Sequence, residues 1–268
     1  MNGKKRYKAL AIDLDGTLLG VNHEISETDA RALEGLRKKK VPIIVVTGRT
    51  LEEIRAFDQC LSFEGDISVL QGGAVIVKFG RDRVVADYSV IRPQDRRTLI
   101  EIAEKNGFYP LVYMGDNPFT QPHENPYHTV YEEMMKHKLF RVDNLKEVQE
   151  KMIVGKISMV AWPEVLDRAE REMEQADLKV SWGRSFDFGT DICCRSKREA
   201  LAEVLKEYGV EREEVVAIGD SDNDREMIVY AGLGVAMGNA TEQLKDAADY
   251  ITYDNEHGGV ANVIQTFF

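Results

Sequence analysis

Long apolar runs that end in polar residues constrain the fold of this chain more than any other feature. The first run covers residues 8–15 and the second covers residues 41–46. A strand that is apolar on both faces is typical of a parallel sheet covered by helices on its two sides. These runs therefore predict an α/β fold built on a doubly wound, mostly parallel sheet.

Helix-start signals lie between the predicted strands. In each signal a Ser or Thr precedes an acidic residue by three positions, which is the pattern of a capping box. The boxes are expected at Ser26 with Asp29, Thr50 with Glu53 and Ser196 with Glu199. Further strands are expected at residues 67–70, 215–218, 234–237 and 250–252, a hairpin of residues 74–77 and 84–85 around Gly80, and a helix from about Asp222. Strands and helices therefore alternate in both halves of the chain.

The middle of the chain has a different pattern. Helices are expected at residues 92–106, 130–138, 145–152 and from Pro163, and strands at residues 109–113, 156–161, 179–182 and 186–192. The segment 114–128, rich in Pro, Asn and His, is expected to be a loop, either a lid over a site or a plain connection. We therefore predict an α+β domain at residues 87–187, inserted between two parts of the core at residues 1–86 and 188–268.

Polar residues follow the predicted core strands at their carboxyl ends, where open parallel sheets bind ligands. Asp13 and Asp15 end the first strand, Thr47 follows the second, and Asp220 follows the strand at residues 215–218. Lys197 lies in the first turn of a capped helix. Because parallel strands end at the same edge, we expect these side chains to converge on one site.

The aspartates of this site indicate a metal. Asp13 and Asp15 are two residues apart, so their side chains leave an extended backbone on the same side. Close carboxylates repel one another unless a cation lies between them or one is protonated, and Asp220 adds a third. Oxygen ligands with room for water and phosphate are what Mg²⁺ prefers. The sequence therefore predicts a Mg²⁺ site.

Thr47, Gly48 and Lys197 indicate a phosphate. Thr47 and Gly48 precede a helix start, where free N–H groups and the helix dipole attract anions. A lysine at a helix N-terminus opposes the dipole, so Lys197 is expected to neutralise an anion there. The net charge of −11 makes such a cation necessary for an anionic ligand. The same charge disfavours nucleic acid and anionic membrane surfaces as partners.

Cysteine usage and hydropathy bear on the compartment. The three cysteines, Cys60, Cys193 and Cys194, include no CxxC pair and do not form a disulfide framework. No apolar run approaches the roughly 18 residues of a membrane span, and the basic start is followed by too short an apolar stretch for a signal peptide. We therefore expect a cytoplasmic protein with reduced thiols. The sequence does not predict an oligomeric state.

Read together, the motifs resemble those of a known family. The segment Asp13-Leu-Asp-Gly-Thr17, then Thr47, Lys197 and Gly219-Asp-Ser-Asp-Asn-Asp224, are similar in order to the four motifs of the haloacid dehalogenase-like superfamily. Asn239-Ala240 and His257-Gly-Gly-Val260 resemble late motifs of its Cof-type subfamily. The large insert lies between Thr47 and Lys197, which is the position of a type-2 cap. The resemblance therefore implies a type IIB member, with a Rossmann-like core and an α/β cap domain.

The resemblance also implies a mechanism. Asp13 would attack the phosphorus of a phosphomonoester and form an aspartyl-phosphate. Asp15 would protonate the leaving oxygen and then take a proton from the hydrolytic water. Mg²⁺ would be held by the Asp13 carboxylate, the Asp15 backbone carbonyl and the Asp220 carboxylate.

Further residues are assigned by the same resemblance. The phosphate would contact the Leu14 and Gly48 amides and the side chains of Thr47, Lys197 and Asn223, with Asp224 supporting Lys197 or the metal-bound waters. The family usually has Gly after the motif lysine, whereas Arg198 stands here. Arg198 is expected to be a second phosphate contact or a solvated helix residue. We assign Asp222 a structural role.

The favoured function is a Mg²⁺-dependent phosphatase of small phosphorylated metabolites, most plausibly sugar phosphates. A phosphotransferase or phosphomutase of related fold is the alternative within enzymes. A receiver-like signalling module shares the Asp, Thr and Lys, but Asp15 would hydrolyse its acyl phosphate, and a receiver has no use for the insert. A catalytically idle binding protein is disfavoured because every motif position is filled.

Overall fold

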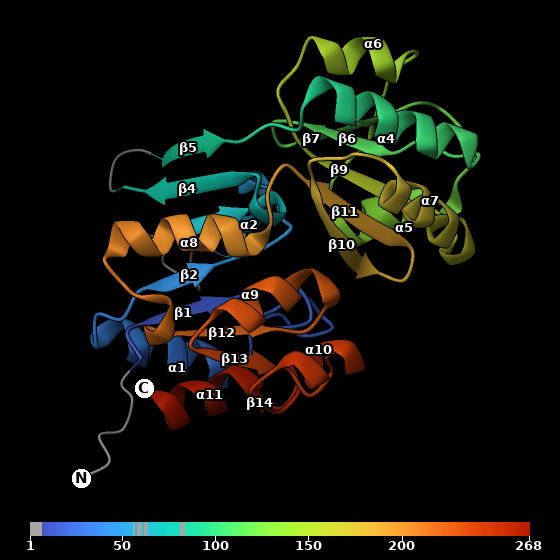
Figure 1. Cartoon of the computed structure of the whole chain (residues 1–268). Coiled ribbons are helices and arrows are strands. Elements are labelled where there is room, and N and C mark those ends of the chain that lie inside the picture. The colour runs from blue at the N-terminus through green and yellow to red at the C-terminus, as the bar shows by residue number, and fades with distance from the viewer. Residues whose placement is uncertain (1–6, 56, 58–60, 62–63, 81–83) are drawn as a thin grey trace.

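The computed structural model describes residues 7–268 except residues 56, 58–60, 62–63 and 81–83 (Figure 1). The basic start and Cys60 therefore lie outside the described residues. The described strands form three sheets. The core sheet has five strands, the cap sheet has six, and a small sheet has three. Figure 1 shows the cap sheet and its helices standing to one side of the core.

The core sheet is entirely parallel. It has the order β14-β13-β12-β1-β2. Every residue of β1, β2 and β12 is buried, whereas Ile251 of the edge strand β14 is exposed. Its strands are β1 (Ala9–Ile12), β2 (Ile43–Val45), β12 (Val215–Gly219), β13 (Leu233–Ala236) and β14 (Tyr250–Ile251). The predicted fold class, a mostly parallel α/β core with a separate cap sheet, is confirmed.

A small antiparallel sheet extends the core beyond β2. It consists of β3 (Ile67–Leu70), β4 (Val75–Phe79) and β5 (Val84–Tyr88), and it contains the predicted hairpin. The backbone N–H of Thr47 donates to the carbonyl of Val69 at 2.9 Å, which joins β3 to the end of β2. The loop after β2 is therefore fixed from both sides.

The core helices are α1 (Glu27–Lys38), α2 (Leu51–Arg55), α8 (Lys197–Tyr208), α9 (Arg225–Tyr230), α10 (Glu242–Ala247) and α11 (Gly259–Phe267), with short 3₁₀ turns η1 (Gln71–Gly73), η2 (Arg212–Glu214) and η3 (Asp222–Asp224). Of these, α1, α2 and α8 begin directly after the predicted caps, whereas the helix expected from about Asp222 starts as η3 and continues as α9. The boxes at Thr50 and Ser196 are complete. Ser26 caps α1, but the Asp29 carboxylate accepts from the Ala261 N–H of α11 instead of closing a box. This contact ties α1 to α11.

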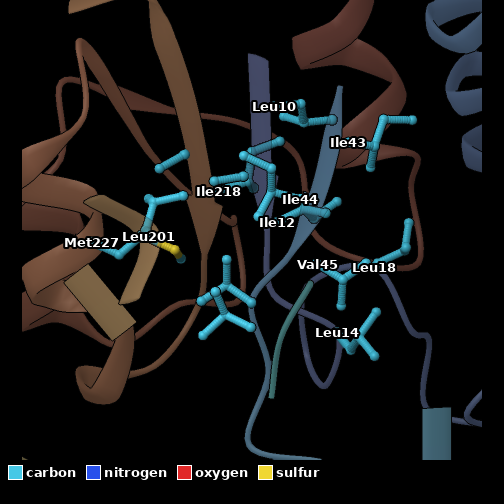
Figure 2. Packing of buried hydrophobic residues seen from close by; sticks show 14 of the residues in the cluster. Leu10, Ile12, Leu14, Leu18, Ile43, Ile44, Val45, Leu201, Ile218 and Met227 are labelled. Carbon is cyan, nitrogen blue, oxygen red and sulfur yellow. The ribbon is translucent and has the colours of Figure 1, made fainter. Parts of the chain in front are cut away.

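The core has a continuous apolar interior. Figure 2 shows Leu10 and Ile12 of β1 beside Ile44 of β2, with Ile218 of β12 and Leu201 of α8 packed near them. Each of these side chains is buried. Because this packing fixes the strands, the residues that directly follow β1 and β12 are held in place.

The cap is built on a mixed sheet with its own apolar cluster. The sheet has the order β10-β11-β9-β6-β7-β8. Its strands are β6 (Leu111–Met114), β7 (Asn117–Thr120), β8 (Phe140–Arg141), β9 (Val154–Val160), β10 (Ser181–Phe186) and β11 (Gly189–Cys193), and its helices are α4 (Pro93–Lys105), α5 (Pro126–Met135), α6 (Leu145–Glu150) and α7 (Pro163–Gln175).

The cap departs from the sequence predictions in two places. The predicted loop at residues 114–128 contains β7 and the start of α5, because Asn125 caps α5 and Pro126 occupies its first position. The predicted boundary at residues 187–188 falls between β10 and β11, which pair with each other. We therefore propose that the second boundary follows Cys193.

Among the described residues, no helix is both long and apolar enough to cross a membrane.

Candidate active site

The site lies at the carboxyl ends of β1 and β12, from which the chain continues to opposite sides of the core sheet. β1 and β12 are neighbours, and the strands that follow each of them lie on opposite sides of this pair. The Asp13 N–H donates to the Ile218 carbonyl at 3.1 Å, which brings the loops after β1 and β12 together. Such a topological switch point is where open α/β sheets bind ligands. Asp13 and Asp220 therefore reach the same space.

Lys197 connects the two loops. Its ammonium donates to Asp13 at 2.7 Å and to Asp224 at 2.6 Å, and it contacts the Asn223 amide oxygen at 3.2 Å. Lys197 is buried in the first turn of α8. Burial acts to lower its pKa, but the two carboxylates outweigh burial and raise it well above the usual value. The ammonium is therefore charged at the centre of the site.

Three carboxylates gather around this ammonium. Asp13, Asp220 and Asp224 each place an oxygen within 4.8 Å of the others. Asp224 is occupied, because it binds Lys197 and accepts the N–H groups of Asp220 and Ser221 at 3.1 and 3.2 Å. In Asp13 and Asp220, the ionised carboxylate is disfavoured. Burial raises the pKa of Asp13 despite Lys197, and burial with Asp224 raises the pKa of Asp220 to about 7.

This donor set fits Mg²⁺. Oxygen ligands at a partly hydrated site are those that Mg²⁺ prefers, and a divalent cation would relieve the repulsion that raises both pKa values. Thr17 orients Asp220 by donating to its carboxylate at 2.6 Å. A glycine is required beside it, because Gly16 has a φ of +78° and a Cβ there would lie 2.3 Å from the Asp220 carboxylate.

Asp15 faces a different partner. Its carboxylate accepts two hydrogen bonds from Arg49, at 2.6 and 2.8 Å, and lies 3.8 Å from a His23 ring nitrogen. Burial acts to raise its pKa, but the hydrogen bonds from Arg49 outweigh burial and lower the pKa to about 2. Its side chain is therefore turned away from the carboxylate cluster, which leaves only its backbone carbonyl for the predicted metal site.

Arg49 was absent from the predicted site residues. The available signal was its place directly after Thr47 and Gly48, at the end of a core strand. Arg49 is 6% exposed, which is rare for an arginine without a partner. Its backbone N–H donates to the Thr47 hydroxyl at 3.2 Å, so the turn and the ion pair with Asp15 form one unit.

The cap contributes a polar group that the sequence analysis missed. The ammonium of Lys156 on β9 donates to the Gly48 carbonyl at 3.0 Å and lies 2.9 Å from Asp191 of β11. Ser158 and Ser185 donate to the same Asp191 carboxylate at 2.5 and 3.0 Å. The signal was the alternation Lys156-Ile-Ser158-Met, which places two polar side chains on one face of a strand.

Cap and core also meet at Asn223. Its amide nitrogen donates to the Ser185 hydroxyl at 2.9 Å, and the backbone of Gly183 lies against Asn223. Lys197 and Asn223 therefore lie beside Asp13, and Gly48 and Asn223 line the same small cavity as Asp13 and Asp15. Asp220 and Asp224 join Asp13 in the carboxylate cluster, whereas Leu14 and Thr47 are placed near the site only as chain neighbours of Asp13 and Gly48.

Two nearby charged residues have structural roles. Arg198 is exposed, and its guanidinium lies over the Tyr230 ring at 5.3 Å, which agrees with the alternative of a solvated helix residue. Asp222 accepts from the Thr241 hydroxyl at 2.8 Å, as its structural assignment requires. Cys193 and Cys194 are free thiols.

An acidic switch point covered by an inserted sheet domain is typical of an α/β enzyme with a cap domain. Comparison with known proteins identifies it further, because a family model described as haloacid dehalogenase-like hydrolase matches residues 10–264. The chain therefore belongs to the haloacid dehalogenase-like hydrolase family. The expectation of a Cof-type member is confirmed.

Individual relatives cover nearly the whole chain. YxeH of Bacillus subtilis is 30% identical over 96% of this chain and 97% of its own length. The 5-amino-6-(5-phospho-D-ribitylamino)uracil phosphatase YcsE of the same organism is 27% identical over 96% and 94%. A crystal structure of a haloacid dehalogenase-like hydrolase from Bacteroides thetaiotaomicron has a TM-score of 0.81 at 29% identity, covering 98% of this chain and all of that one. These relatives agree with the expected enzyme class, a phosphoric monoester hydrolase.

Proposed function

We propose that this chain hydrolyses small phosphorylated metabolites, sugar phosphates above all, through an aspartyl-phosphate on Asp13. One observation carries the proposal. The buried Asp13 carboxylate lies 2.7 Å from Lys197 and lines one small cavity together with Asp15. A nucleophile that is paired with a cation, and a second carboxylate, thus border the space that a phosphate would occupy.

Asp13 supplies the nucleophile. Its carboxylate must be ionised to attack phosphorus, and burial opposes ionisation. The ammonium of Lys197 favours the ionised form, and it remains beside the phosphoryl oxygens when the Asp13–phosphorus bond forms and the ester P–O bond breaks. Lys197 therefore serves both the nucleophile and the charge that develops on the phosphate.

Asp15 supplies proton transfer. In the first step its carboxyl proton goes to the leaving alkoxide, and in the second its carboxylate takes a proton from the water that attacks phosphorus. The ion pair with Arg49 keeps Asp15 ionised in the structure. A bound phosphate competes for the Arg49 guanidinium, and Asp15 then regains the higher pKa that burial favours, so that it can carry the proton.

The phosphate would be held by groups from three loops and from the first turn of α8. They are the Leu14 and Gly48 amides, the Thr47 hydroxyl, the Lys197 ammonium and the Asn223 amide. Asp13, Asp220 and the Asp15 backbone carbonyl would hold Mg²⁺, with Asp224 supporting Lys197. The bound ion would neutralise charge on the phosphoryl oxygens. These roles are supported by the donor set and by the raised pKa of Asp220.

A small, polyhydroxylated substrate is supported by two observations. The cap covers the site through the contact of Lys156 with Gly48, which favours a small substrate over a polymer. The relative YcsE is named for a substrate whose phosphate is carried on a ribityl chain. The negative charge of the chain disfavours nucleic acid as a substrate.

Hydrolysis of para-nitrophenyl phosphate with Mg²⁺ tests the proposal. Asp13→Asn should lower kcat by more than about 10³-fold, because it removes the nucleophile, and EDTA should abolish the activity of the wild type. Asp222→Asn is the matched control, because it removes a nearby carboxylate that binds Thr241. Activity that survives Asp13→Asn would refute the mechanism. With glucose 1-phosphate, relocation of the phosphoryl group without release of inorganic phosphate would indicate a phosphomutase.

A further inference from the structure

Two cavities meet beneath the cap. The inner cavity has a volume of about 40 Å³ and borders Asp13 and Asp15, whereas the outer cavity has about 620 Å³. The outer cavity is lined by His23, Glu24, Ile25, Arg49, Glu52, Glu53, Phe57, Met134, Met135, Lys136 and His137. Arg49 and Met135 line both cavities. The inner cavity has room for only a small group of a few heavy atoms, whereas the outer one has the size of a ligand site.

The position of Asp15 directs the leaving group toward the outer cavity. This step rests on the proposed function, in which Asp15 protonates the leaving oxygen. The Asp15 carboxylate contacts Arg49 at 2.6 Å and lies 3.8 Å from His23, and both of these residues line the outer cavity. A substrate whose phosphorus lies beside Asp13 and whose ester oxygen faces Asp15 therefore extends its remaining atoms past Arg49.

The charges of the outer cavity disfavour a second anion. Arg49 is neutralised by Asp15, or by the bound phosphate that competes for it, and His137 lies 3.6 Å from Glu53. Among the described residues that line the cavity, the remaining carboxylates are those of Glu24 and Glu52, and the remaining ammonium is that of Lys136. A hydroxyl can donate to these carboxylates, whereas a carboxylate or second phosphate on the leaving group would be repelled by them.

Apolar side chains complete the lining. Ile25, Phe57, Met134 and Met135 offer surface to C–H groups, and Phe57 already lies under the Arg49 guanidinium at 5.3 Å. We propose that the outer cavity binds the leaving group and selects uncharged, polyhydroxylated leaving groups over anionic ones of similar size. Its glutamates bind the hydroxyls, and its apolar wall packs against the carbon chain.

Filling the outer cavity tests where the leaving group binds. Met134→Trp should lower kcat/KM for glucose 6-phosphate by about tenfold or more, since several contacts of the sugar are lost. The kcat/KM for acetyl phosphate, whose leaving group is too small to reach Met134, should change less than about twofold. Met152→Trp is the matched control, because Met152 is an exposed methionine that lines neither cavity. Equal losses for both substrates would overturn the proposal.

A charge reversal tests the selectivity. The wild type should prefer glucose 6-phosphate to 6-phosphogluconate, which differs by a carboxylate, and Glu52→Lys should shift this preference toward 6-phosphogluconate on the order of tenfold. Glu147→Lys on α6, outside both cavities, should leave the ratio unchanged. A wild-type preference for the gluconate, or an unchanged ratio in Glu52→Lys, would overturn the selectivity. Failure of the wild type to hydrolyse acetyl phosphate, glucose 6-phosphate and para-nitrophenyl phosphate would refute the proposed function itself.

Discussion

The core sheet and the cap sheet bury polar groups in different places. In the core, β1 is apolar throughout and Asp13 follows its last residue. In the cap, β9 carries Lys156 and Ser158 within a strand whose seven residues are all buried. The core therefore builds its part of the site from the loops at a sheet edge, whereas the cap builds its part from the face of a sheet. Each half has one buried lysine at its centre, and comparing these two lysines separates their roles.

Replacing the core lysine has the largest expected effect. Lys197→Met leaves Asp13 and Asp224 buried without their cation, so the free energy of unfolding should fall by about 3–5 kcal/mol at pH 7. The kcat/KM for para-nitrophenyl phosphate should fall by more than about 10³-fold. Urea unfolding and steady-state kinetics measure the two effects. Lys206→Met, an exposed position on the same helix, is the control. A loss of activity below tenfold would place Lys197 outside the reaction.

Replacing the cap lysine should separate stability from activity. Lys156→Met leaves the buried Asp191 carboxylate without its cation and the Gly48 carbonyl without its donor. The free energy of unfolding should therefore fall by about 3 kcal/mol. The kcat/KM should fall by only about 10- to 100-fold, because the Gly48 turn shifts but the reacting groups remain. Adding Asp191→Asn should restore part of the stability and none of the activity. If Lys156→Met were as inactive as Lys197→Met, the contrast between the two halves would fail.

The ion pair between Asp15 and Arg49 predicts a pH-dependent stability in the core. The pKa of Asp15 is lowered to about 2 in the folded state from 3.8. A lowered pKa stabilises the fold above the unfolded value, and this contribution disappears as the pH falls toward 2. Arg49→Ala should therefore cost about 2 kcal/mol at pH 7, and its difference from the wild type should shrink below about pH 4.

The control for this pH dependence is another arginine. Arg198→Ala removes a guanidinium that lies over Tyr230, with no carboxylate bound to it in the described structure. Its effect on the free energy of unfolding should be small and independent of pH. Urea unfolding between pH 3 and pH 7 gives both curves. If the difference in free energy of unfolding between Arg49→Ala and the wild type stays constant down to pH 3, Arg49 does not lower the pKa of Asp15.

The contrast between core and cap explains which site residues could be predicted from the sequence. Asp13, Asp220 and the Thr47–Gly48 turn follow apolar strands of a parallel sheet, and the topology of such a sheet brings strand ends together. Lys197 was found because a capping box fixed the start of its helix. Local patterns were enough because each of these residues lies at the end of an element.

The cap residues could not be found in this way. Lys156, Asp191 and Ser185 lie on three strands, and only the register of β9, β10 and β11 brings them together. Arg49 was adjacent to a predicted motif, but its role depends on the side-chain direction of Asp15. Segment 114–128 was predicted as a loop because Pro and Asn are common in turns, whereas here they begin a helix and lie in a strand. Pairing across long sequence distances decides all of these positions.

The smallest expected effect lies at the seam between core and cap. His137 follows α5 in the cap, and its ring nitrogen lies 3.6 Å from Glu53 of α2 in the core. The nearby Glu53 carboxylate raises the pKa of His137, with further contributions from Glu52 and Asp116. A raised histidine pKa stabilises the folded seam below pH 6.5, and the contribution is lost as the pH rises through the folded pKa.

His137→Gln should therefore speed hydrogen exchange of the α2 and α5 amides a few-fold at pH 6, corresponding to about 1 kcal/mol or less. The difference from the wild type should vanish at pH 9, after correction for intrinsic exchange. His128→Gln is the matched control on α5, because burial lowers the pKa of His128 to about 4 and the imidazole is neutral at both pH values. Its difference from the wild type should be the same at pH 6 and pH 9. A His137→Gln difference that is equally constant would mean that packing, and not charge, holds the cap against the core at this point.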